Sequence, residues 1–76
     1  MFEVVGFAHS QFTAKDTGQV ITGYNIYVQY EDKHVTGYKC ERFYLADGKC
    51  DYRPQLGDRI QVRYNRYGKV ESIISV

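Results

Sequence analysis

The chain has 76 residues, of which 43% are hydrophobic and 16% aromatic, and its formal net charge is +1. This length allows one domain with one core, and no apolar run approaches the roughly 20 residues that a membrane-spanning helix needs. A domain this small buries only about 60–65% of the surface that its unfolded chain exposes, so we expect marginal stability that self-association could supplement.

The pattern along the chain is that of short strands, because Tyr, Val, Ile, Phe and Thr dominate and helical periodicity is absent. We predict a first strand from Phe2 to about Phe12 and a turn at residues 14–18, where Gly18 can adopt a positive φ. The second strand, Gln19 to Tyr30, alternates cleanly. The face expected to meet the core carries Val20, Thr22, Tyr24, Ile26, Val28 and Tyr30.

A polar turn at residues 31–34 leads into a predicted third strand from Val35 to Leu45. Neither face of this segment is uniformly apolar, so we expect a bulge near Gly37 or Cys40 that switches its facing. Residues 46–57 are too few and too marked by glycine and proline for a good helix.

The fourth strand is predicted from Arg59 to Asn65, a turn follows at residues 66–68, and the fifth strand runs from Lys69 to Val76. Five antiparallel strands with short connections must close, or nearly close, to protect their edges. We therefore predict one all-β domain over residues 1–76. Its architecture would be a small five-stranded antiparallel barrel, OB-fold-like with the usual helix reduced to a loop, or alternatively SH3-like. The side chains expected to point inward from these two strands are Ile60, Val62, Tyr64, Val70, Ser72, Ile74 and Val76.

Motifs for catalysis, cofactors and metals are missing from the sequence. Ser10 adjoins His9, but neighbouring residues on a strand point to opposite faces, and Asp47 and Asp51 lie in a predicted loop. No phosphate-cradling glycine pattern or dinucleotide fingerprint occurs. We therefore predict a protein that is not an enzyme and takes no cofactor. A metal site is not expected either, because no close ligand pair occurs among His9, His34, Cys40 and Cys50.

No signal peptide precedes the first predicted strand, so the reducing cytoplasm is the expected location. In that compartment free thiols at Cys40 and Cys50 are favoured over a disulfide between them, which stays the alternative.

Tyrosine is the most suggestive feature for binding: the chain has eight, with four phenylalanines. A core this small accommodates about four to six large rings, so some tyrosines should be exposed, where each base stacked on a ring contributes roughly 1–3 kcal/mol. The predicted registers leave Tyr27 and Tyr38 off the core face, and Tyr67 in a hairpin turn. Cross-strand packing of Tyr27 and capping of the barrel end by Tyr67 are the alternatives.

Basic residues gather in the C-terminal third. Residues 1–51 carry five basic and seven acidic side chains, whereas residues 52–76 carry five basic and two acidic ones. Our leading hypothesis is therefore non-catalytic binding of single-stranded nucleic acid, foremost DNA, by exposed tyrosines and a basic C-terminal hairpin. The cations expected to meet phosphates are Arg59, Arg63, Arg66 and Lys69.

A second hypothesis is a protein-interaction or structural module that acts through an exposed strand edge or an aromatic patch. The same side chains would serve it, because Tyr and Arg are also enriched at protein interfaces. An enzyme or a small-ligand receptor is the remaining alternative.

Residues 52–70 (YRPQLGDRIQVRYNRYGKV), with Val5-Gly6-Phe7 and Gly23-Tyr24-Asn25, resemble small proteins encoded by Gram-positive bacteria and their phages or mobile elements. In outline the chain is also similar to the helix-destabilising single-stranded-DNA-binding proteins of filamentous phages, which are small, tyrosine-bearing OB-type barrels. The first resemblance covers most of the chain and implies little about function. The second covers architecture alone and implies a homodimer with a nucleic-acid-facing surface; it assigns no individual residue.

Overall fold

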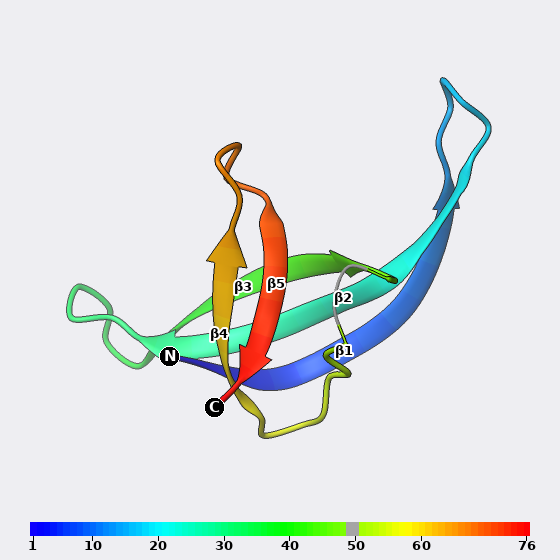
Figure 1. Ribbon diagram of the computed structural model, residues 1–76. Coiled ribbons are helices and arrows are strands. Elements are labelled where there is room, and N and C mark those ends of the chain that lie inside the picture. Colours follow the sequence, from blue (N-terminus) through cyan, green and yellow to red (C-terminus); the bar gives the residue numbers. More distant parts are fainter. Residues whose placement is uncertain (49–50) are drawn as a thin grey trace.

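The computed structural model describes residues 1–48 and 51–76, and these form one sheet of five antiparallel strands (Figure 1). The strand order across the sheet is β3-β2-β1-β4-β5. The described ranges contain no helix, and so none with the length and apolar character needed to cross a bilayer. The strands are β1 (Phe2–Thr13), β2 (Val20–Glu31), β3 (Tyr38–Ala46), β4 (Arg59–Tyr64) and β5 (Val70–Ser75).

The sheet folds over on itself, with the β4–β5 hairpin lying across the β1–β2–β3 half (Figure 1). β1 belongs to both halves, because it pairs with β2 along its length and with β4 at Phe2 and Glu3. β3 and β5 approach each other without a strand ladder between them. The all-β, five-stranded antiparallel prediction is confirmed, and the sheet remains open between β3 and β5.

The core lies between the two halves. Ile26 and Val28 of β2 are fully buried, as the alternation of that strand predicted. Burying one large aliphatic side chain contributes about 1.5–3 kcal/mol, so a small set of them holds the halves together. The buried set is Val4, Ile26, Val28, Phe43, Leu45, Ile60 and Ile73.

The prediction for the third strand was wrong in two respects. β3 begins at Tyr38, and its pairing with β2 runs without interruption from Ala46 opposite Gly23 to Tyr38 opposite Glu31, so it has no bulge. The mixed polarity has another cause. Only Phe43 and Leu45 reach the core, whereas the earlier part of the strand is exposed on both faces.

The facing predicted for the last two strands was wrong in part. A register shift occurs between Arg63 and Tyr64, which pair with Ser72 and Val70, so Glu71 is an extra residue in β5. Such a bulge reverses the facing of the residues after it. Ile73 is therefore buried at 5% exposure, whereas Ile74, predicted inward, is 40% exposed.

Candidate functional site

A groove of about 450 Å³ lies where β3 faces the β4–β5 hairpin across the open side of the sheet. Residues from four strands, β2 to β5, and from the β4–β5 turn line it. We call it the seam groove, and its lining residues are Ile21, Arg42, Phe43, Tyr44, Ala46, Tyr64, Gly68, Lys69 and Val70.

The charged side chains of the seam groove are both cations, Arg42 from β3 and Lys69 from the hairpin, and no carboxylate belongs to the described lining. Glu41 does not line the groove, although it shares with Phe43 one face of β3; its carboxylate accepts a hydrogen bond from the Tyr30 hydroxyl at 3.0 Å. Burial, with a smaller effect of the Glu41 charge, raises the pKa of Tyr64, so this phenol stays neutral at physiological pH. The groove thus combines positive charge with neutral aromatic rings.

Tyr44 is positioned by Gly23 of β2. A Cβ at Gly23 would lie 2.6 Å from Cε2 of the Tyr44 ring and 2.5 Å from the Leu45 carbonyl oxygen, so the ring occupies the space of the missing side chain. Phe12 meets the same ring edge-on, with centroids 6.1 Å apart. The buried Tyr44 hydroxyl has no hydrogen-bond partner within the described ranges. The ring therefore rests against β2 while it lines the groove.

Three of the predicted binding residues lie in the β4–β5 turn at one end of the seam groove. Lys69 lines the groove, and the guanidinium carbon of Arg66 is 5.1 Å from the centroid of the Tyr67 ring. Tyr67 is 72% exposed. The Asn65 side-chain oxygen accepts hydrogen bonds from the backbone N–H groups of Tyr67 at 2.9 Å and Lys69 at 3.1 Å, which holds the turn in shape.

Tyr27 lies on the outer face of β2, where it is 43% exposed. It pairs directly across the strands with Arg42, so both side chains project from the same face. Arg42 also lines the seam groove. It therefore connects the outer aromatic face of β2 with the groove.

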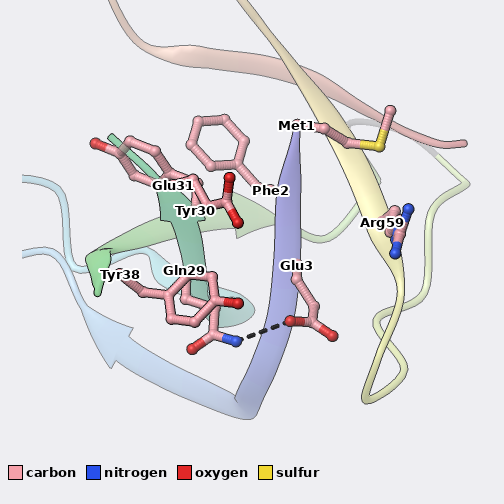
Figure 2. A pocket seen from close by; sticks show the side chains of 8 residues that line it. All are labelled: Met1, Phe2, Glu3, Gln29, Tyr30, Glu31, Tyr38 and Arg59. Carbon is pink, nitrogen blue, oxygen red and sulfur yellow. Dashed lines mark hydrogen bonds between the residues drawn. The ribbon is translucent and has the colours of Figure 1, made fainter. Parts of the chain in front are cut away.

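Tyr38 and Arg59 lie elsewhere, in a second groove of about 200 Å³ beside the N-terminus (Figure 2). Two carboxylates, Glu3 and Glu31, line this second groove with them, and the Gln29 amide donates to Glu3 at 2.8 Å, the dashed line in Figure 2. A phosphate entering here would meet both carboxylates. We therefore exclude Tyr38 and Arg59 from the candidate site.

Arg63 lies on β4 between Val62, which packs on the core, and Tyr64. It is exposed and points away from the core, toward the outer face of the β4–β5 hairpin. It cannot share a surface with Tyr27, which points outward from the opposite half. The seven predicted residues thus fall on three separate surfaces.

The sequence reasoning missed three groove residues: Arg42, Tyr44 and Tyr64. Arg42 and Tyr44 share one face of the third strand by simple alternation, but the expected bulge obscured that signal. Tyr64 was assigned to the core, although it is 49% exposed at the groove.

His9 pairs with Asp47: its Nε2 lies 2.8 Å from Oδ2 of the carboxylate. Hydrogen bonds, first from His9 and then from Thr22, lower the pKa of Asp47. Cys40 is exposed on β3. Cys50 lies outside the described residues, so its thiol state and its pairing with Cys40 stay predictions.

Comparison with known proteins adds no assignment: no protein-family model, curated protein or solved structure matches this chain.

Proposed function

We propose that the protein binds single-stranded nucleic acid, foremost DNA, in the seam groove and performs no catalysis. One observation carries the proposal: aromatic rings and two cations line an open groove in which no described residue contributes a carboxylate. Single-strand binding by other proteins uses this combination, with rings stacking on bases and cations following the phosphates.

We also infer that the open sheet is an OB-type barrel. β1 is bent by an extra residue at Val5 and is shared between both halves, and β3 approaches β5, as in a partly open five-stranded barrel. In such barrels oligonucleotides bind to the face of the second and third strands and to the loop between the fourth and fifth. The seam groove lies between the equivalents of these two elements.

Each groove residue then has a role. Tyr44 and Tyr64 stack on bases, each contributing roughly 1–3 kcal/mol. Arg42 and Lys69 contact phosphates, and Arg42 also adds its planar guanidinium for stacking. Tyr27 extends the site along β2, and Arg66 with Tyr67 extends it along the hairpin turn. These residues accommodate a few nucleotides without reading their sequence.

The test is a titration of a short oligothymidylate into the protein, followed by quenching of tyrosine fluorescence at low salt. We expect quenching that is reversed as salt rises, because phosphate contacts release counterions. Arg42→Gln and Lys69→Gln should each weaken binding and lower the slope of log K against log salt by about 1. Tyr64→Leu should cost about 1–3 kcal/mol of binding.

Arg63→Gln is the matched control, since it removes the same charge from β4 on the surface that faces away from the groove. Its affinity and salt slope should differ only slightly from those of the original protein. Absence of quenching at tens of micromolar oligonucleotide would contradict the proposal. An equal loss from Arg63→Gln and Arg42→Gln would reject the seam groove as the site.

A further inference from the structure

The far half of β1 has an edge that no other strand among the described residues pairs with. β1 pairs with β4 only at Phe2 and Glu3, and the backbone of Val4 bonds Gly57 and Asp58. Beyond Val4, β2 supplies the only backbone hydrogen bonds that reach β1 from residues 1–48 and 51–76. In Figure 1 this part of β1 runs with β2 into an arm that extends beyond the β4–β5 hairpin.

The register of the β1–β2 pairing determines which backbone N–H and C=O groups of β1 point toward this edge. Ala14 N–H bonds Gln19 C=O at the end of the hairpin, so even-numbered residues of the far half of β1 bond β2. The odd-numbered residues therefore turn their N–H and C=O groups toward the open side. They are Phe7, His9, Gln11 and Thr13.

This edge lacks the usual protection against pairing with another strand. Exposed edges are normally protected by charged residues, proline, bulges or short length. The β3 edge carries Lys39, Glu41 and Arg42, and β5 is a six-residue strand interrupted at Glu71. The segment Phe7–Thr13 (FAHSQFT) contains no Lys, Arg, Asp, Glu or Pro, and Phe7 and Phe12 are exposed.

We infer that this β1 edge pairs with the β1 edge of a second copy of the chain, forming an antiparallel, two-fold symmetric dimer with a continuous sheet. A second copy fits because self-pairing of a segment without Lys, Arg, Asp or Glu brings no like charges together. The register with the greatest overlap is centred on Ser10. It places Phe12 directly opposite Ala8 of the second copy.

In this register the two Ser10 residues form a non-hydrogen-bonded pair with Cα atoms about 4.5 Å apart, which is within disulfide range. Ser10→Cys, in a chain with Cys40 and Cys50 replaced by serine, should therefore form a covalent dimer under mild oxidation. Ser75→Cys, at the exposed end of β5, is the matched control and should remain monomeric in a denaturing gel.

Light scattering on the unmodified protein at a concentration of about 100 µM should give twice the chain mass of 8.9 kDa. On dilution the measured mass should fall toward that of a single chain. Gln11→Lys places a charge on the edge and should raise the dimer dissociation constant about tenfold, whereas Gln61→Lys, the same change on β4, should not. A monomer at every concentration, or Ser75→Cys cross-linking in place of Ser10→Cys, would overturn the inference. A complex that forms only with a different protein would overturn it as well. None of these measurements involves nucleic acid, so they stand or fall independently of the proposed function.

Discussion

The volume beside Gly23 on β2 is occupied by the ring of Tyr44, and this contact links a backbone requirement to the candidate site. The glycine is not needed for its φ, since its backbone is that of an ordinary strand residue. It is needed because a methyl group there would overlap both a carbonyl oxygen of β3 and an aromatic ring. One hydrogen atom in place of a side chain thus allows β2 and β3 to pair with Tyr44 lying against them.

Gly23→Ala should lower the free energy of unfolding by about 1–3 kcal/mol, because the overlap includes backbone that cannot move without widening the β2–β3 pair. It should also weaken oligonucleotide binding by displacing Tyr44. Urea denaturation measures the first effect and fluorescence titration the second. Gly6→Ala is the control, since its new methyl group would lie 3.7 Å from the Tyr27 ring, an ordinary contact. Equal losses from the two variants would contradict this account.

The pKa of Tyr52 predicts how the stability of the fold depends on pH. Burial, and then the hydrogen bond that its hydroxyl donates to Asp58 at 2.8 Å, raise the pKa of Tyr52 above its ordinary value of 10.0. The unfolded chain therefore loses this proton at a lower pH than the folded protein does. The resulting stabilisation is complete below pH 10 and is lost as the pH rises above it.

Tyr52→Phe should lower stability by about 1 kcal/mol at neutral pH, through loss of the hydrogen bond, and should flatten the decline above pH 10. Urea denaturation at a series of alkaline pH values measures both effects. If the two proteins lose stability in parallel above pH 10, Tyr52 is not the group responsible.

At the scale of elements, two bulges determine the shape of the site. The extra residue at Val5 bends β1 so that it serves both halves of the sheet. The extra residue at Glu71 reverses the facing of β5, which turns Ile73 into the core while Val70 stays at the groove. Both bulges lie on strands that form the boundary between the two halves.

The bulge in β5 can be tested with adjacent residues of the same type. Ile73→Ala should destabilise the protein by about 2–4 kcal/mol, because it empties a filled core position. Ile74→Ala should cost less than about 1 kcal/mol, because its side chain is partly in solvent. Thermal or urea unfolding measures the loss of stability in each of the two variants. The opposite order would mean that β5 continues its alternation without a bulge.

At the scale of the whole molecule, the chain is an elongated body, 43 × 23 × 21 Å along its principal axes. Its two halves share one core, and the pairing that joins them connects Phe2 with Ile60, near opposite ends of the chain. Neither half can bury its apolar face alone, so the two should unfold together.

Folding should accordingly be slow for so small a protein. Non-local strand pairing requires the chain to close long loops before most contacts form, which places all-β domains of this kind in the millisecond-to-second range. Stopped-flow refolding followed by tyrosine fluorescence should show one phase in that range. Refolding within microseconds would mean that local hairpins, and not the pairing of Phe2 with Ile60, limit the rate.

Local features of the sequence were sufficient to predict the elements. Alternation identified β2 and its buried residues Ile26 and Val28, because side-chain facing in a strand depends only on neighbouring residues. The turn at Gly68 followed from glycine chemistry, and its φ of 77° agrees. The surplus of tyrosine over core volume predicted exposed rings, and Tyr27, Tyr38 and Tyr67 are indeed exposed.

Only the tertiary structure decided which of these residues share a surface. The seam groove joins Arg42 and Tyr44 of β3 to Tyr64 and Lys69 of the hairpin, and these two groups are separated by about 20 residues along the chain. The bulges were likewise hidden, because a bulge is defined by pairing with a distant strand and leaves the local alternation ambiguous. The alternation of neighbouring residues was enough to predict the strands, and the surplus of tyrosine was enough to predict exposed rings. The separation of Arg63 from Tyr27, and the meeting of Arg42 with Lys69, depend on how the sheet folds over its core.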